Sequence, residues 1–418
     1  MEVLSVTGGS QLRGTVDLHG AKNSVLPILT ATLLCGAPCV LHNCPDITDV
    51  RITLGILESL GCLWQRDGDT VSVDASGLRG CQVPGTLACC LRSSVLFAGA
   101  LLARMGCAGV PMPGGCPLGK RPVDLHLAGF EKMGASVSVE DCVIRCRCKA
   151  LRPAKIRLPY PSVGATENLL LAAMGCPGEV ELCGAAREPE IEDLANFLNC
   201  CGAKIEGAGS SSIRISGGKP LHGTEYTVMP DRMEAATYLC ACAGCGGDLR
   251  LRRGNLKTIL PLAELLGQCG CRMSGDAEEI RIRSSGRLHM EGSVETAPYP
   301  GFPTDAQAVL MAALLRAEGT LRIRETVFED RFRHVPELRK LGAQIELDGQ
   351  TAQLRGVSKL RGAGLCAGDL RGAAALVIGA LQCPEKSVIT GVKHLKRGYD
   401  NLEKNLQTLG AEISLQNL

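Results

Sequence analysis

The sequence is poor in aromatic residues and carries almost no net charge. Phe, Trp and Tyr make up 3% of the 418 residues, too few for the stacking platforms of proteins that bind single-stranded nucleic acid. Lys and Arg total 45 and Asp and Glu total 43, so the formal charge is only +2. No overall field therefore attracts nucleic acid or an anionic membrane, and we expect neither as a partner. Any anion-binding site must be local.

Long apolar runs are also missing. The longest, Val25 to Leu41, is interrupted by Pro27, Gly36 and Pro38, which argues against a helix that spans a bilayer. The chain begins Met1-Glu2-Val3-Leu4-Ser5, without the basic and apolar regions of a secretory signal. We therefore expect a protein of the cytoplasm.

Cysteine, in contrast, is abundant, with 23 residues. In a reducing compartment most of these thiols are expected to act as small hydrophobic side chains. Two sets could suggest zinc sites. Cys142, Cys146 and Cys148 fall in a strand pattern, and Cys240, Cys242 and Cys245 fall in an apolar helix. Neither set has the paired spacing of a structural zinc site. We expect no metal and no cofactor.

An internal repeat accounts for nearly the whole chain. A phrase of Leu or Phe, a few residues, then Gly followed by alternating polar and apolar residues recurs six times, with glycines at 61, 134, 202, 270, 342 and 410. The steps between them are 73, 68, 68, 72 and 68 residues. Each glycine is typical of the left-handed residue that ends a helix, and each following segment has the period of a strand.

A second, more apolar helix is expected midway between these glycines, at Ser93–Ala103, Thr166–Met174, Glu234–Ala243, Asp305–Arg316 and Gly372–Leu381. Each unit then contains a strand, helix, strand, helix and two strands. The all-round apolar helices indicate an interior position, with the amphipathic helices outside. Six units in 418 residues favour two lobes of three units, although no linker marks a boundary.

Cations stand at the starts of several apolar helices. Lys and Arg oppose the helix dipole there, so their presence suggests a shared anion site: Lys22, Arg92, Arg232 and Arg371. Thr304 and Asp305 also lie at such a start, where ordinary capping explains them equally well. Arg331 and Arg397 lie 66 residues apart, at equivalent places in consecutive repeats, and are expected to converge on one pocket.

The segment from Val110 to Pro122 has four prolines and three glycines, which predicts an exposed loop. Cys116 stands in it, close to Lys120 and Arg121, whose charges would lower the pKa of a thiol. A catalytic cysteine and an inert one both fit the residues alone.

Together these phrases resemble the enolpyruvyl transferase family, and within it the branch that acts on UDP-N-acetylglucosamine. The resemblance extends over nearly the whole chain. Its most specific blocks are Pro113-Gly114-Gly115-Cys116, Arg121-Pro122-Val123-Asp124-Leu125-His126, Phe302-Pro303-Thr304-Asp305 and Glu325-Thr326-Val327-Phe328-Glu329 with Arg331.

The resemblance implies a two-lobed, inside-out α/β barrel fold of six βαβαββ repeats, three in each lobe. Residues 21–229 would form the first lobe and carry the Cys116 loop, and residues 1–20 with 230–418 would form the second. The active site would lie between the lobes of a monomer.

The implied reaction transfers the enolpyruvyl group of phosphoenolpyruvate to the 3′-hydroxyl of UDP-N-acetylglucosamine and releases phosphate, by addition and elimination through a tetrahedral intermediate. This is the first committed step of peptidoglycan synthesis. Asp305 matches the base, and Cys116 the group that can add to phosphoenolpyruvate or serve as acid. Lys22 and Arg397 complete the implied catalytic set.

The resemblance also implies two sets of binding residues. Phosphoenolpyruvate would contact Lys22, Asn23, Arg121, Arg331 and Arg397. UDP-N-acetylglucosamine would contact Asn23, Arg92, Arg121, Pro122, Val123, Asp124, Leu125, Ser162, Val163, Gly164, Asp305 and Val327.

Three positions depart from the common pattern of this branch: Pro117 after the cysteine, Tyr160 where a basic residue is usual, and Lys396 in place of an acidic one. Two alternatives stay open. One is the shikimate-pathway enolpyruvyl transferase, which lacks such a loop cysteine, and the other is a paralogue that binds the UDP-sugar and regulates without catalysis.

Overall fold

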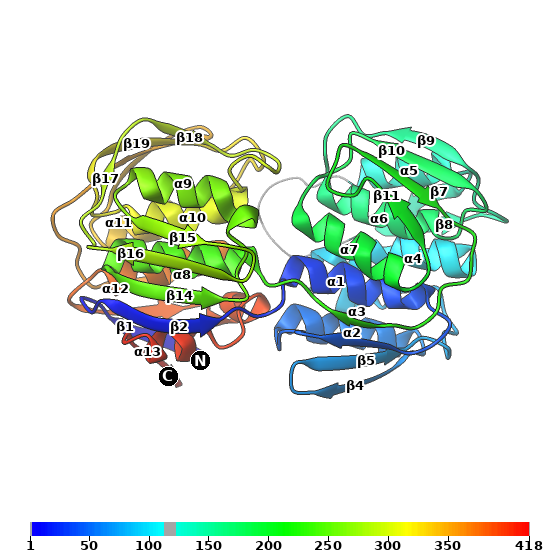
Figure 1. Cartoon of the computed structure of the whole chain (residues 1–418), viewed down its shortest axis with the longest axis horizontal. Helices are drawn as coiled ribbons and strands as arrows, with labels where there is room; N and C mark the ends of the chain where they lie inside the picture. The colour runs from blue at the N-terminus through cyan, green and yellow to red at the C-terminus, as the bar shows by residue number, and fades with distance from the viewer. Residues whose placement is uncertain (1, 113–122, 418) are drawn as a thin grey trace. The chain divides into compact units, whose positions relative to one another are not determined.

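The computed structural model of the protein describes residues 2–112 and 123–417. These residues divide into two compact units, each with its own hydrophobic core. We call residues 20–112 with 123–229 the N-terminal unit, and residues 2–19 with 230–417 the C-terminal unit. Figure 1 labels the elements of both.

The described residues of the N-terminal unit form three sheets. The strand orders are β13 (Glu225–Thr227), β3 (Cys39–His42), β5 (Thr70–Asp74), β4 (Leu63–Asp67); β6 (Cys107–Pro111), β8 (Val143–Arg147), β7 (Ser136–Glu140); and β11 (Lys204–Glu206), β12 (Ser212–Ser216), β10 (Glu179–Cys183), β9 (Ala154–Arg157).

The described residues of the C-terminal unit also form three sheets. The orders are β15 (Arg272–Gly275), β16 (Glu279–Ser284), β14 (Gly247–Arg252), β2 (Leu12–Asp17); β17 (His289–Met290), β19 (Glu318–Arg324), β21 (Thr351–Arg355), β20 (Gln344–Asp348), with β18 (Ser293–Glu295) also on β19; and β22 (Gly364–Cys366), β23 (Lys386–Thr390), β1 (Glu2–Thr7), β24 (Glu412–Asn417).

The six sheets share one plan. A parallel pair at one side is followed by antiparallel strands, as in β9 with β10 and β17 with β19. The sheet of β6 has an isolated parallel bridge from Gln82 to Gly109 where the others have that parallel edge strand. In the sixth sheet the N-terminal strand β1 pairs with β24, so the start of the chain completes the last repeat.

Six apolar helices lie in the interiors of the two units. They are α1 (Lys22–Ala31), α4 (Leu96–Met105) and α6 (Val163–Ala173) in the N-terminal unit, and α8 (Arg232–Cys245), α10 (Thr304–Ala313) and α12 (Leu370–Leu381) in the C-terminal unit. In α12 every residue from Arg371 to Leu381 is buried. A helix that is apolar on all sides needs neighbours all round, and the predicted interior position is confirmed.

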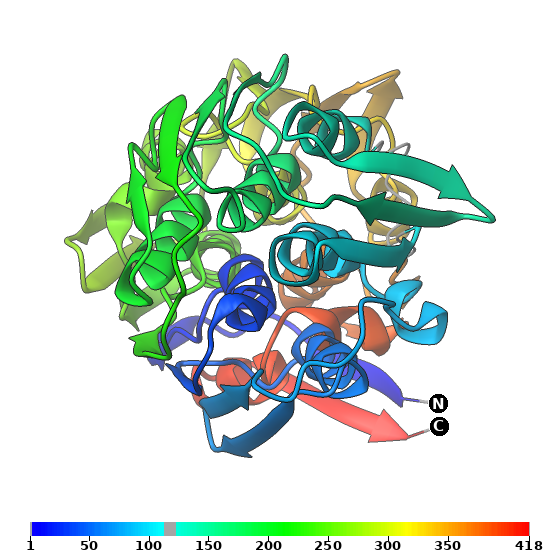
Figure 2. The same cartoon turned by 90° about the vertical axis from the view of Figure 1, so that its right-hand side faces the viewer.

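The amphipathic helices pack against the sheets, and most of them also pack against the inner helices. They are α2 (Thr48–Ser59), α5 (Asp124–Lys132), α7 (Pro189–Cys200), α9 (Leu260–Gln268), α11 (Val335–Lys340) and α13 (Leu402–Thr408), with the short α3 (Gly85–Ala88) besides. Figure 2 views the helices of the N-terminal unit nearly end-on, with strands at its periphery.

The repeat glycines end these outer helices as the sequence predicts. All six have φ between 88° and 105°, a region that glycine adopts without the cost a side chain would add. The predicted apolar helices are also present, but most of them begin a few residues earlier than their apolar patterns. In the described residues no helix combines the length and apolar character needed to cross a bilayer.

Candidate active site

Asp305 is the centre of a charge cluster in the C-terminal unit. It lies in the first turn of α10, and its Oδ1 accepts a hydrogen bond from Nη2 of Arg331 at 2.5 Å. Its Oδ2 accepts from Nη2 and Nε of Arg371 at 2.9 and 3.2 Å. The arginine side chains are 3% and 5% exposed, whereas that of Asp305 is 28% exposed. The carboxylate is therefore the accessible member of the cluster.

Further bonds fix the two arginines. Nε and Nη2 of Arg331 both donate to the carbonyl oxygen of Thr304 at 3.3 Å. Nη1 of Arg371 donates to the Tyr399 hydroxyl at 3.3 Å, and that hydroxyl lies 2.8 Å from Oγ1 of Thr237. Burial opposes the charge of Arg371, but the Asp305 carboxylate raises the pKa of that arginine above its usual range. The cluster is therefore ionic and rigidly supported.

Glu325 connects this cluster to the segment that contains Val327. Its Oε2 accepts from the Thr304 hydroxyl at 2.9 Å, and its Oε1 accepts from the backbone nitrogens of Val327 and Phe328 at 2.9 and 3.1 Å. Glu325 is 1% exposed. A buried carboxylate with these partners fixes the backbone of Val327 relative to the start of α10.

Arg397 ends a short 3-10 turn, Val392–Arg397, and is half-buried. Burial, with the charges of Lys393 and Arg397, lowers the pKa of His394, while Asp369 opposes that shift. Asp369 caps α12 through the backbone nitrogens of Arg371 and Gly372.

Arg331 influences a second histidine, His334. Burial lowers the pKa of His334 to about 4, with Asp369 opposing and Arg331 adding to the shift. Arg331 and Arg397 thus each influence the pKa of a histidine on which Asp369 has the opposite effect. The expected convergence of Arg331 and Arg397 on one pocket stays a prediction.

In the N-terminal unit Lys22 opens helix α1 and pairs with a buried acid. Its Nζ lies 2.7 Å from Oδ2 of Asp49, whose side chain is 1% exposed, against 12% for Lys22. Asn23, the next residue, is exposed. The expected need for negative charge beside Lys22 and Arg371 is met here by the protein's own carboxylates, Asp49 and Asp305.

Three of the segments expected to bind the nucleotide sugar meet around His126. Burial and the Arg92 guanidinium lower the pKa of His126 to about 4, against an opposing effect of Asp124. A Cβ built on Gly164 would lie 3.4 Å from Cε1 of the His126 ring. Nδ2 of Asn168 lies 2.9 Å from Nδ1 of His126 and donates to the carbonyl oxygen of Val95. This packing of α6 against α5 positions Arg92, Asp124 and Gly164 together.

The remaining expected residues have ordinary local roles or lie outside the described residues. Ser162 caps α6 through the backbone nitrogen of Ala165 at 3.3 Å, and Val163 begins that helix. Val123 is buried before α5, and Leu125 is half-buried in its first turn. Cys116, Pro117, Arg121 and Pro122 fall in 113–122, outside the described residues.

Sequence reasoning missed three side chains that hold this arrangement together: Asp49, Glu325 in its role as a backbone acceptor, and His126 as the centre of a cluster. The sequence around Asp49 in α2 and around His126 in α5 does not indicate which residues they contact. Only the packing of the helices supplies those contacts.

Two α/β units built from six sheets of one plan, with cations and acids at the starts of their inner helices, define the enolpyruvyl transferase fold class. Solved structures bear this out. The enolpyruvyl transferase NikO from Streptomyces tendae aligns with a TM-score of 0.89 at 28% identity, covering 100% of this chain and 99% of that one. EPSP synthase from Acinetobacter baumannii aligns at 0.77 and 17% identity over both full chains, a likeness of fold alone.

The chain belongs to the EPSP synthase (3-phosphoshikimate 1-carboxyvinyltransferase) family, whose model matches residues 6–406. Among relatives, the UDP-N-acetylglucosamine 1-carboxyvinyltransferase 2 of Caldanaerobacter subterraneus subsp. tengcongensis is 44% identical over 413 residues, 99% of both chains. The UDP-N-acetylglucosamine 1-carboxyvinyltransferase of a Synechocystis species is also 44% identical, over 99% of this chain and 95% of its own.

Proposed function

We propose that this protein transfers the enolpyruvyl (1-carboxyvinyl) group of phosphoenolpyruvate to the 3′-hydroxyl of UDP-N-acetylglucosamine and releases phosphate. The reaction would be the first committed step of peptidoglycan synthesis. The observation that carries this proposal is the 44% identity, over nearly the full length, to relatives named for that transfer. The charge cluster at Asp305 supports it.

The chemistry proceeds by addition and elimination. Asp305 accepts the proton of the 3′-hydroxyl while the oxygen attacks C2 of phosphoenolpyruvate, and an acid protonates C3. The tetrahedral intermediate then loses a proton from C3 and expels phosphate from C2, which restores the double bond. We assign the acid role to Cys116. The exposure of Asp305 beside two buried arginines suits a base that must reach a substrate.

Cations are needed for the phosphate and the carboxylate of phosphoenolpyruvate, because both carry charge throughout the reaction. We assign Lys22, Arg121 and Arg397 to the phosphate, and Arg331 with Arg397 to the carboxylate. Asn23 is assigned as a further, uncharged contact of phosphoenolpyruvate. The arginine fork matches a carboxylate or phosphate in two-point geometry, which suits Arg121, Arg331 and Arg397 to this role.

We assign the nucleotide sugar to residues of both units. From the N-terminal unit these are Asn23, Arg92, Arg121, Pro122, Val123, Asp124, Leu125, Ser162, Val163 and Gly164, and from the C-terminal unit Asp305 and Val327. The clustering of Arg92, Asp124 and Gly164 around His126 supports a common role for them. The hydrogen bond from the Val327 nitrogen to Glu325 supports the assignment of Val327, because it fixes the backbone there.

We also propose that residues 21–229 and residues 1–20 with 230–418 are the two lobes of the enzyme, which acts as a monomer in the cytoplasm. All 22 cysteines in the described residues are free thiols, in keeping with a reducing compartment. Size-exclusion chromatography with light scattering tests the monomer, with one chain per particle expected and a stable dimer contradicting it.

Product analysis tests the activity directly. Purified protein is incubated with phosphoenolpyruvate and UDP-N-acetylglucosamine, and the nucleotide product is identified by mass spectrometry and by the vinyl protons in its NMR spectrum. We expect one enolpyruvyl ether per phosphate released, and a large loss of both in Cys116→Ala. Binding of the UDP-sugar without any product would instead indicate a regulatory paralogue.

A further inference from the structure

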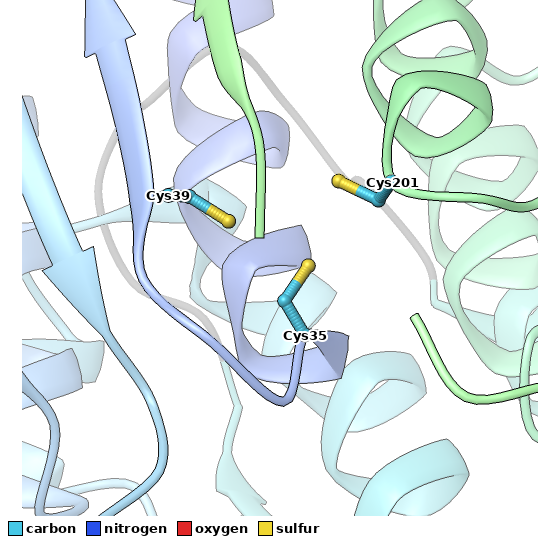
Figure 3. A group of neighbouring side chains, drawn as sticks. All are labelled: Cys35, Cys39 and Cys201. Carbon is cyan, nitrogen blue, oxygen red and sulfur yellow. The ribbon is translucent and has the colours of Figure 1, made fainter. Parts of the chain in front are cut away.

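Three thiols of the N-terminal unit form a cluster with no part in the proposed reaction. Cys35 follows the 3-10 turn Thr32–Leu34, Cys39 opens β3 and Cys201 caps the C-terminus of α7. All three are 0% exposed, and their sulfur atoms lie within 4.8 Å of one another. Figure 3 shows the three side chains directed toward a common space.

The backbone around each sulfur is anchored, that of Cys39 by its pairing with Val73 of β5. The Cys35 nitrogen donates to the carbonyl oxygen of Thr32 at 3.1 Å, and the next nitrogen, of Gly36, donates to Leu221 at 2.9 Å. The carbonyl oxygen of Cys201 accepts from the nitrogen of His222 at 3.0 Å. The three side chains therefore meet without rearrangement of the chain, as a preorganised ligand set requires.

Two other buried cysteines each contact a carbonyl oxygen of their own segment. The thiol of Cys44 lies 3.6 Å from the carbonyl oxygen of Leu41, and that of Cys383 lies 3.3 Å from that of Gly379. Cys39 has a similar contact with the Ala37 carbonyl oxygen at 4.0 Å, so the difference lies in the grouping of three sulfurs. In the part of the chain that the structure describes, only Cys35, Cys39 and Cys201 form a group of three side chains with the spacing of metal ligands.

We propose that Cys35, Cys39 and Cys201 bind one thiophilic divalent metal ion of the zinc class through three thiolate sulfurs. A metal–sulfur bond of about 2.3 Å places three sulfurs around a central ion about 4 Å apart, within the spacing of this cluster. A water or another small ligand would occupy the fourth position. The ion would connect the start of β3 to the end of α7.

The charge balance favours a divalent ion. Three thiols lose three protons to solvent as M²⁺ forms three metal–sulfur bonds, which leaves a net charge of −1 and changes no oxidation state. A monovalent ion would leave −2 in a buried site, at a higher desolvation cost.

Metal titration of the full chain tests this site. Reduced protein is first freed of metal with a chelator and is then titrated with Cd²⁺ under anaerobic conditions. A competing chelator is added, and the Cd²⁺ equivalents that stay bound to the protein are counted from the thiolate-to-cadmium absorption. Exposed thiols elsewhere also bind Cd²⁺, so the variants are decisive. Wild type should retain one more equivalent than each of Cys35→Ala, Cys39→Ala and Cys201→Ala. Cys44→Ala, the matched buried control, should retain as many as wild type.

A second measurement is independent of any substitution. X-ray absorption of wild-type protein loaded with one equivalent of Zn²⁺ should give three sulfur neighbours. Two or fewer sulfurs would overturn the proposal, as would full retention of Cd²⁺ in any of the three variants or its loss in Cys44→Ala. Thermal unfolding should also shift upward with Zn²⁺ in wild type and not in Cys39→Ser, since an ion bound only by the native state stabilises it.

Discussion

Asp305 and Arg371 stand 66 residues apart in the chain, yet both nitrogens Nη2 and Nε of Arg371 donate to the same oxygen of Asp305, at 2.9 and 3.2 Å. Asp305 lies in the first turn of α10 and Arg371 in that of α12, so the pair links the starts of two inner helices. Equivalent repeats thus supply complementary charges to one point. The arginine side remains buried while the carboxylate stays accessible.

The proposed base gives the most direct catalytic prediction. Asp305→Asn keeps the size of the side chain but cannot accept the hydroxyl proton, so kcat should fall by roughly 10² to 10⁴-fold. UDP-N-acetylglucosamine affinity, measured by calorimetry, should change by less than about tenfold, since one contact is altered. Asp330→Asn, on the exposed side of the neighbouring segment, is the control. A variant with kcat near that of wild type would exclude Asp305 as the base.

The pair of Lys22 and Asp49 separates stability from activity. Lys22→Gln takes the ammonium partner from a carboxylate that is 1% exposed, so the free energy of unfolding should fall by about 2–3 kcal/mol. Lys22→Gln with Asp49→Asn should recover most of this loss in denaturant unfolding, because no buried charge then lacks its ammonium. Turnover should stay low in both, since the phosphate cation is absent. Recovery of activity in the double variant would contradict the role given to Lys22.

Glu325 is expected to act as a positioning residue for nucleotide-sugar binding. Glu325→Gln weakens the charge-assisted bonds to the Val327 and Phe328 nitrogens, so KM for UDP-N-acetylglucosamine should rise roughly tenfold, about 1.4 kcal/mol. The kcat at saturation should stay within about twofold, because the reacting groups are unchanged. Glu329→Gln, exposed in the same segment, is the control. A fall in kcat with unchanged KM would contradict a positioning role.

His126 predicts a pH dependence of stability. Its folded-state pKa of about 4 lies below the ordinary value of 6.5, so the unfolded chain binds the extra proton between these limits. The contribution of His126 to the free energy of unfolding is complete above pH 6.5. It declines as the pH falls toward 4, by about 3 kcal/mol in all. Protonation of the ring would also make Nδ1 of His126 a donor, facing the Nδ2 donor of Asn168 at 2.9 Å.

The test compares denaturant unfolding of wild type and His126→Gln between pH 7.5 and about 5, where the glutamine has no charge to gain. The stability of wild type relative to the variant should fall as pH is lowered. His289→Gln, at an exposed position, controls for the loss of any histidine. Parallel curves for wild type and His126→Gln would show that the ring is not buried in its neutral form.

Much of this fold follows from local patterns in the sequence. Gly342 and its five counterparts mark helix ends because a left-handed residue there excludes most side chains, and the all-apolar stretch of α12 marks an interior helix. The predicted ends of the helices are less accurate than the prediction that the helices exist. The helix α6 begins at Val163 rather than Thr166, because the Ser162 cap and not the apolar pattern decides its start.

The partners of the site residues could not be predicted from the sequence. The packing of α1 against α2 brings Lys22 to Asp49, and the hydrophobic periodicity of the sequence does not predict that contact. Cys201 likewise meets Cys35 and Cys39 from a distant repeat, where spacing rules for metal sites do not apply. The cations at helix starts were recognised, but their carboxylate partners depend on tertiary structure.

Acceptor selectivity tests the central claim most directly. Phosphate release from phosphoenolpyruvate is measured with UDP-N-acetylglucosamine or with 3-phosphoshikimate as the only acceptor. The account predicts release with the nucleotide sugar alone, reduced sharply in Cys116→Ala and Asp305→Asn. Release with 3-phosphoshikimate would place the protein in the shikimate branch of its family, and release with neither acceptor would contradict enzymatic function.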